Sequence, residues 1–401
     1  MSFLRSNRTS AALLLAAAVL GLAIANSPLA DAAHSIQQSH IGWPGIGLDL
    51  SVGHWISDGI LAIFFFIVAI ELKHEFTEGD LNSVGKAIRP AIAALGGILV
   101  PIAIYLAFTW GSGYEGGWPI PTATDIAFAL GVLAVVGRGL PTTVRAFLLA
   151  LAVLDDLAGI LFIAVFFTTG AQIGLILLGA LLAVLFGFLS WRYARLRRDA
   201  VRPSQTRHRG LEWVLIIGMV AVGLATWYVV YQSGIHATIA GVALGFAMHR
   251  KPAHRARYLI EPFSNVIVLP LFAFSAALVT IPSLGETPLE APFWGIIVAL
   301  PVGKLIGIVG ATLLADRILR SRQAPVLRFG DMIAAGALGG IGFTVSLLMN
   351  DLAFADNRAI ADQGVLAVII GSAISIVVSV FVVRLRARHY RALRLSEKDA
   401  A

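Results

Sequence analysis

Four ionisable residues stand inside long apolar stretches of this 401-residue chain. Asp155 and Asp156 interrupt the apolar run 149–157, and Asp125 and Lys304 are each flanked by apolar or small residues. Placing a charge at membrane depth costs several kcal/mol, roughly 2.5–3.5 by insertion scales, so such residues usually serve a site or a proton path. These four residues therefore predict a site that handles ions inside a membrane.

The adjacent pair Asp155 and Asp156 predicts a site for protons or a small cation. Neighbouring helical residues point about 100° apart, so one carboxylate can line a cavity while the other reaches a neighbouring helix. Two close carboxylates repel each other, and this repulsion favours neutralisation by a proton or a metal cation. We expect Asp155 and Asp156 to be the cation ligands. The alternative is that they cap a helix or form a salt bridge at the membrane edge.

Two predicted spans carry signs of interruption. Two prolines and two threonines precede Asp125 within the span 114–137, and a glycine-rich stretch, 336–344, lies in the span 331–350. Proline removes a backbone donor, and irregular backbone is tolerated at membrane depth only in protein or beside a cavity. Paired interruptions indicate a transporter built from inverted repeats. Close helix packing is the alternative interpretation of the glycines.

Lys304 has two possible roles. Interrupted helices that cross would bring half-helix ends, with their partial charges, close together. Asp125 is suited to offset the positive ends, while Lys304 could offset the negative ends or pair with Asp155. If the span boundaries are wrong, Lys304 could instead extend towards the membrane surface.

Composition places these residues in an all-α membrane protein. The chain is 58% hydrophobic and 13% charged, against about 25% charged in soluble domains, and lacks the alternating pattern of a membrane barrel. With no cysteine, disulfides and thiolate sites are excluded. We expect one membrane domain, 1–401, with about twelve spans of roughly 20 residues. The predicted spans are 11–30, 54–72, 90–110, 114–137, 144–169, 171–191, 211–232, 234–249 (short for a span), 264–283, 292–315, 331–350 and 360–385.

The basic residues support this count. With twelve spans, 28 of the 30 Lys and Arg residues fall on one side, with Arg358 opposite and Lys304 inside a span. Because cytoplasmic loops are enriched in Lys and Arg, both termini are expected in the cytoplasm. The net charge of +7 then reflects topology and not nucleic-acid binding. The run 11–30 could be a signal peptide, but its length favours a retained helix.

Several motifs, in order and covering nearly the whole chain, resemble NhaA-type sodium/proton antiporters. They are Glu71-Leu72-Lys73, Pro90-Ala91-Ile92-Ala93-Ala94, the stretch 121–131 (PTATDIAFALG), Leu154-Asp155-Asp156-Leu157, Ser233-Gly234-Ile235-His236-Ala237-Thr238, the stretch 269–274 (LPLFAF) and Gly340-Ile341-Gly342-Phe343-Thr344.

This resemblance implies a twelve-helix, inverted-repeat fold in which the fourth and eleventh spans are interrupted and cross. It implies that Asp156 is the central carboxylate for cation and proton, with Asp155 as its partner, linked to Lys304 in the protonation cycle. Thr124 and Asp125 would belong to the crossing, as accessory ligands.

The resemblance also implies pH-regulated exchange of Na+ or Li+ for H+ across the inner membrane, with two protons per sodium, in a homodimer. His236, Glu71 and Glu75 fall where the family places residues that affect the pH response. The sequence departs from the family pattern at two positions that bear on this pH response. His74 stands where better-studied relatives carry Arg, and Arg257 stands where an acid is expected.

Two other functions also use charged residues inside a membrane. An intramembrane aspartyl protease needs two membrane Asp residues, but its Gly-x-Gly-Asp element is absent here. A channel would show a pore-like ring of repeats, which the sequence lacks. The sequence therefore predicts a transporter, not an enzyme, with sodium or lithium ions, protons and the bilayer as partners and no cofactor.

Overall fold

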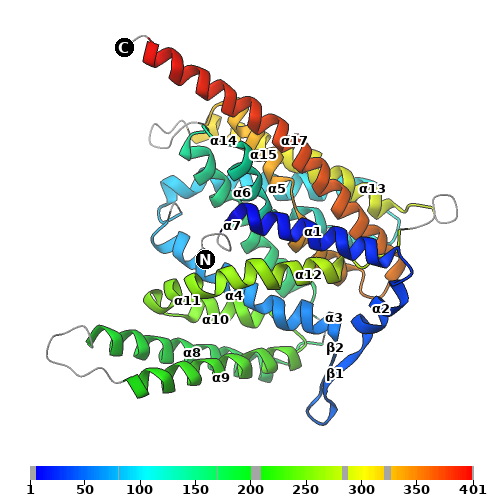
Figure 1. The fold of residues 1–401 in the computed structure, drawn as a ribbon, viewed down its shortest axis with the longest axis vertical. Helices are drawn as coiled ribbons and strands as arrows, with labels where there is room; N and C mark the ends of the chain where they lie inside the picture. The colour runs from blue at the N-terminus through cyan, green and yellow to red at the C-terminus, as the bar shows by residue number, and fades with distance from the viewer. Residues whose placement is uncertain are drawn as a thin grey trace. The chain divides into compact units, whose positions relative to one another are not determined.

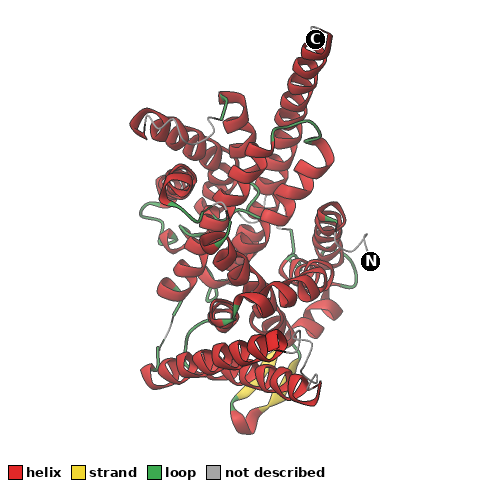
Figure 2. Cartoon of the chain, turned by 90° about the vertical axis from the view of Figure 1, so that its left-hand side faces the viewer, coloured by secondary structure: helices red, strands yellow, loops and turns green. Residues whose placement is uncertain are grey.

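The computed structural model of the protein describes residues 6–79, 81–168, 170–199, 209–281, 288–319 and 327–399. Most of these are helical, and the described residues include one two-stranded sheet (Figure 2). Parts of the predicted basic loops, at 200–208 and 320–326, and the end of the predicted span 264–283 lie outside the described residues.

Most of the predicted spans contain helices, because each span is a long apolar run (Figure 1). They are α1 (Asn7–Ala25), α2 (Ala30–Gln38), α3 (Val52–His54), α4 (Leu61–Thr77), α5 (Val84–Thr109), α6 (Ile126–Val136), α7 (Thr142–Phe166), α8 (Ile173–Asp199), α9 (Arg209–Gln232), α10 (Thr238–Ala247), α11 (Arg250–Phe263), α12 (Leu269–Ala276), α13 (Ala291–Val298), α14 (Lys304–Leu319), α15 (Phe329–Gly339), α16 (Phe343–Ala353) and α17 (Arg358–Asp399).

Three π-helical turns join consecutive helices into longer ones: η3 (Trp55–Ile60), η6 (Ser264–Val268) and η7 (Ala299–Gly303). Two 3-10 turns, η4 (Glu115–Gly117) and η5 (Ile120–Thr122), precede α6. Within the described residues, ten helical segments are long and apolar enough to cross a membrane. The pair α15 and α16, bent by 46°, would make an eleventh.

Three segments differ from the prediction. The expected span 234–249 is the ten-residue helix α10, which is shorter than a span. The expected span 264–283 belongs to a longer segment that starts at Arg250, because the amphipathic helix α11 continues through η6 into α12. The stretch 31–53, between the first two predicted spans, contains most of α2 and a hairpin of β1 (His40–Trp43) and β2 (Leu48–Ser51), with Trp43 opposite Leu48.

The chain divides into two compact units. Unit 1 comprises Met1–His34, Glu75–Gly159 and Ala273–Ala401. In unit 1, α5 packs on α14 at Gly96 and Gly307, where a Cβ on either glycine would collide with the backbone of the other helix. The first helix is also bound within this unit, since Asn26 at the end of α1 donates to Val279 O over 3.0 Å and accepts from Ile281 N over 2.8 Å.

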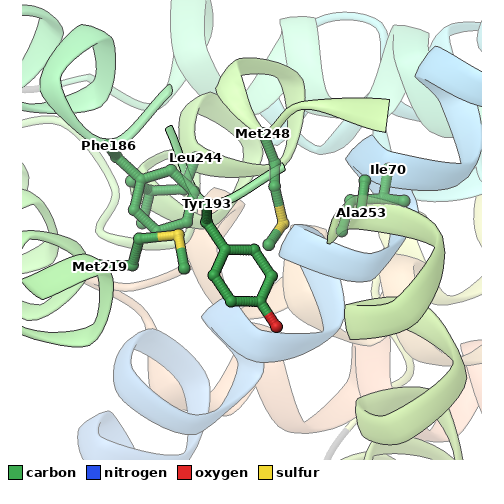
Figure 3. Packing of buried hydrophobic residues seen from close by; sticks show 7 residues of the cluster. All are labelled: Ile70, Phe186, Tyr193, Met219, Leu244, Met248 and Ala253. Carbon is green, nitrogen blue, oxygen red and sulfur yellow. The ribbon is translucent and has the colours of Figure 1, made fainter. Parts of the chain in front are cut away.

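Unit 2 comprises Ser35–His74 and Ile160–Phe272. The helices α8 and α9 lie side by side in it (Figure 1). A buried cluster joins this pair to α4, α10 and α11 (Figure 3). It consists of Ile70, Phe186, Tyr193, Met219, Leu244, Met248 and Ala253.

Candidate ion site

The first interruption precedes α6. The 3-10 turn η5 ends at Thr122, and the chain is extended at Ala123 and Asp125 before α6 starts at Ile126. Asp125 is the N-cap of α6, because its Oδ1 accepts a hydrogen bond from Phe128 N over 3.1 Å. The carboxylate thus satisfies one of the free N–H groups at a helix start.

The second interruption meets the first. Helix α15 ends at Gly339 and α16 starts at Phe343. Asp125 Oδ2 accepts from both the N–H (3.1 Å) and the hydroxyl (2.7 Å) of Thr344. In return, Asp125 N donates to Ile341 O over 2.5 Å. Asp125 therefore bonds to the first turns of two half-helices, where a negative charge offsets the positive ends of the helix dipoles.

Lys304 and Asp155 form a fully buried ion pair. Lys304 follows the π-helical turn η7 at the start of α14, and its Nζ lies 2.6 Å from Asp155 Oδ2 of α7, with both side chains 0% exposed. Thr124 joins them: its hydroxyl lies 2.7 Å from Asp155 Oδ2 and 3.1 Å from Lys304 Nζ. Four of the predicted site residues, Thr124, Asp125, Asp155 and Lys304, are thus brought together within unit 1.

Asp155 and Asp156 occupy different environments, as their neighbouring positions on one helix predict. Asp155 is 1% exposed, whereas Asp156 is half-buried. Asp155 Oδ1 is buried and has no hydrogen-bond partner among the described residues. A buried carboxylate oxygen without a donor is costly, so this atom is suited to accept a proton. Asp156 is the more accessible carboxylate of the two.

The predicted pH-response residues have different neighbours. In unit 2, His236 Nε2 contacts Asp58 Oδ1 over 3.0 Å, and Glu71 Oε1 contacts Arg257 Nη2 over 2.8 Å. Asp58 and Glu71 are 13 positions apart on one helical segment, which is about 20 Å at 1.5 Å per residue. Glu75, 8% exposed, folds its carboxylate back over Gly79 in unit 1.

Two paired carboxylates, the half-buried Asp58 and the buried Asp331, were not predicted as site residues. Asp58 lies inside the predicted span 54–72, and an acid inside a span is the sequence signal that could have identified it. Asp58 pairs with His236. Asp331 was the first residue of the predicted span 331–350. It is 2% exposed and binds Arg386 Nε over 3.0 Å and the Tyr390 hydroxyl over 2.6 Å.

The sequence matches the family described as Na+/H+ antiporter 1 over residues 1–383. The chain belongs to the Na+/H+ antiporter 1 family. A Na(+)/H(+) antiporter NhaA 2 from Clavibacter michiganensis subsp. michiganensis (strain NCPPB 382) is 53% identical over 391 residues, which cover 97% of this chain and 93% of that relative.

More distant members of the Na+/H+ antiporter 1 family also align over nearly the whole chain. A Na(+)/H(+) antiporter NhaA from Tropheryma whipplei (strain Twist) is 45% identical, with 96% of this chain and 95% of the relative covered. A Na(+)/H(+) antiporter NhaA 3 from Streptomyces coelicolor (strain ATCC BAA-471 / A3(2) / M145) is 41% identical, with 98% and 82% covered.

Membership of the Na+/H+ antiporter 1 family confirms the resemblance that the motifs indicated. It also confirms that the protein is a secondary transporter and not an enzyme. The apolar helices agree with a multi-pass membrane protein.

Proposed function

We propose that this protein exchanges Na+ or Li+ for H+ across the inner membrane and thereby serves sodium and pH homeostasis. The observation that carries the proposal is the buried Asp155–Lys304 pair, 2.6 Å apart, directly beside the more accessible Asp156. Oxygen ligands are those that hard cations prefer. A carboxylate can hold either a proton or a cation, which is the competition that an antiporter needs.

Each carboxylate has its own part in this mechanism. Asp156 binds the transported cation, with Asp155, Thr124 and Asp125 as further oxygen ligands. Binding of the cation at Asp156 releases its proton, and the Asp155–Lys304 pair releases the second. Protons and cation then occupy the same site in alternation. Because two protons would be exchanged for one monovalent cation, each cycle moves one net charge.

The surrounding helices would supply alternating access. We propose twelve spans, with α10 as the short one, arranged as inverted repeats across the whole chain, 1–401. The segment 114–137 and the pair α15–α16 would be the two interrupted, crossing helices. The bonds of Asp125 to Thr344 and Ile341 support a contact between the interruptions. Such half-helix ends are typical of ion sites in transporters.

The pH response would arise from three ionisable residues, His236, Glu71 and Glu75. His236 is a candidate because its ring contacts the Asp58 carboxylate and the Thr238 hydroxyl, at 3.0 and 2.8 Å. Glu71, which contacts Arg257, and Glu75 are the other candidates. With both termini in the cytoplasm, Glu71 and Glu75 would lie on the cytoplasmic side. We further propose that the protein works as a homodimer.

Everted membrane vesicles test the exchange. After respiration has acidified the lumen, addition of NaCl or LiCl should release protons and restore the fluorescence of a pH-sensitive dye. Asp156→Asn and Asp155→Asn should each abolish the response, because an amide cannot hold a proton and a cation in turn. Asp49→Asn, an exposed acid of the hairpin, is the control. Full exchange in Asp156→Asn would exclude this site.

The stoichiometry has its own test. With two protons per sodium, the membrane potential contributes about 2.3 kcal/mol per 100 mV for each cycle. The rate and end point of exchange in proteoliposomes should therefore follow a potential set by potassium and valinomycin. Indifference to the potential would indicate one-for-one exchange.

A further inference from the structure

The long helix α17 changes from apolar to basic along its length (Figure 1). Its part 364–383 contains no Asp, Glu, Lys or Arg and has the length of about 20 residues that crosses a bilayer. The next part of the same helix carries Arg384, Arg386, Arg388 and Arg391. Arg384 is therefore placed where the helix leaves the hydrocarbon core and reaches the lipid headgroups.

Three of these arginines continue an exposed apolar stripe. Val377 and Phe381 are exposed, and the exposed Arg384, Arg388 and Arg391 follow them at intervals of three and four residues. Residues three and four apart lie on one face of a helix. We call these three arginines the basic stripe; it extends over about 10 Å at 1.5 Å per residue. One face of α17 thus offers first apolar side chains and then guanidinium groups.

The basic stripe has no acidic partner among the residues that the structure describes. Arg391 Nε donates to Ala387 O of its own helix, over 3.2 Å. Arg386, on another face of α17, pairs instead with Asp331 of α15 over 3.0 Å. A guanidinium group presents a fork of N–H donors that matches a phosphate as well as a carboxylate. The basic stripe is therefore available for an anion from outside the protein.

The turn between α6 and α7 adds positive charge beside the stripe. Gly139 of this turn packs on Arg391, since a Cβ on the glycine would lie 3.2 Å from Arg391 Cγ. The preceding residue, Arg138, is exposed. The negative end of the α6 dipole is already offset nearby, because Arg8 Nε donates to Ala134 O over 3.0 Å. The surroundings of Arg391 therefore favour a negatively charged ligand.

We propose that the basic stripe binds the headgroups of anionic phospholipids. The guanidinium groups hold the lipid phosphate, and the acyl chains lie along Val377 and Phe381 of the same face. Basic residues that directly follow a membrane span attract anionic lipids, and a zwitterionic headgroup gains less because it carries its own cation. The apolar continuation of the stripe favours a lipid over a soluble anion. This inference does not depend on which ions the protein exchanges.

A fluorescent label beside the stripe tests the proposal. The chain has no cysteine, so Leu385→Cys, at an exposed position of α17, gives a single labelling site. In phosphatidylcholine proteoliposomes, quenching of the label by spin-labelled phosphatidylglycerol or spin-labelled phosphatidylcholine measures the relative affinity of the two lipids. We expect about a tenfold preference for phosphatidylglycerol, the effect of one to two arginines near a membrane surface. A label at Ile173→Cys, exposed in the stretch 146–191 that lacks Lys and Arg, should show no preference.

Charge removal then identifies the residues. With the label at position 385, a variant that combines Arg384→Gln, Arg388→Gln and Arg391→Gln should lose the preference for phosphatidylglycerol. The matched control removes three exposed arginines from the end of α8 and should keep the preference; it combines Arg192→Gln, Arg195→Gln and Arg198→Gln. A measurement without these charge substitutions supports the comparison: a high concentration of KCl should weaken the preference, because salt screens exposed charges.

Several results would overturn the inference. Equal quenching by the two lipids at position 385 would show that the stripe does not select anionic headgroups. A preference that survives the triple variant of α17, or that KCl leaves unchanged, would assign the selection to something other than these arginines. If inorganic phosphate removes the preference while KCl of equal ionic strength does not, the stripe binds free phosphate and is not a lipid site.

Discussion

Lys304 Nζ and Asp155 Oδ2 lie 2.6 Å apart, and neither side chain is exposed. Both charged groups are desolvated, so each charge is compensated mainly by the other. Removing one partner leaves a buried charge, which typically costs about 3–5 kcal/mol. This dependence allows the pair to be tested through the stability of the protein as well as through transport.

We expect Lys304→Gln or Asp155→Asn alone to lower the thermal unfolding temperature in detergent more than the double variant does. The double variant replaces two charges with two neutral groups of similar shape, so no charge remains uncompensated. Exchange should be lost in all three. Additive losses of unfolding temperature would show that the two residues do not stabilise each other in solution.

Lys304→Arg distinguishes two roles of the lysine. An arginine stays charged at any accessible pH, whereas a buried lysine can release its proton. If Lys304 takes part in carrying a proton, this variant should give a reduced current on addition of sodium to proteoliposomes, although it keeps the positive charge. An undiminished current with the original pH profile would leave Lys304 as a structural counter-charge.

Asp125 should matter for stability through its hydrogen bonds to two half-helices. In Asp125→Ala, the N-cap of α6 and the hydrogen bonds from Thr344 of α16 are both lost, and an N-cap contributes about 0.5–2 kcal/mol. Asp125→Asn keeps an oxygen acceptor and should unfold at a temperature between those of the alanine variant and the unmodified protein. Chemical or thermal unfolding in detergent measures this order, and equal losses in both variants would contradict the capping role.

His249, between α10 and α11, predicts a loss of stability in acid. The pKa of His249 lies below its usual value of 6.5, mainly because the side chain is desolvated by burial. Nearby positive charges lower this pKa further; they belong to Lys73, Arg198, Arg250 and Lys251. The unfolded chain therefore binds a proton that the folded protein resists, and stability falls as the pH drops through 6.5 towards the folded pKa.

Unfolding temperatures at pH 7.5 and 5.5 measure this effect. His249→Gln removes the titrating group and should reduce the difference between the two temperatures. The exposed His254 of α11 is the control position, and His254→Gln should leave the difference in place. An unchanged difference in His249→Gln would refute the assignment.

Many of the helices could be predicted from the sequence because a membrane permits few backbone structures. Backbone exposed to lipid finds no hydrogen-bond partner in the bilayer, and a helix satisfies its own N–H and C=O groups, so apolar runs such as 90–110 predict helices directly. Prolines and Asp125 likewise indicated the first interruption. The family motifs then implied that the fourth and eleventh spans cross, which stays a prediction.

Other features depend on contacts between distant residues, which no local pattern contains. Asp331 of α15 binds Arg386 and Tyr390 of α17. These contacts exist only because α15 and α17 lie side by side in the folded protein. The position of Gly339 O against the Thr124 hydroxyl, 215 residues away in the chain, likewise requires the folded structure. The hairpin 40–51 was missed because its strands are only four residues each.

The bonds of Asn26 to Val279 and Ile281 have a consequence for biosynthesis. Val279 follows Asn26 by 253 residues, and a ribosome adds about 5–20 residues per second. The bonds of Asn26 to Val279 and Ile281 therefore form at least about 13–50 s after α1 has been made. During this interval Asn26 can still donate to Leu22 O of its own helix, over 2.7 Å, and α6, which also packs on α1, is made well before Val279. The first helix therefore gains its contact with α6 before its C-terminal end is fixed.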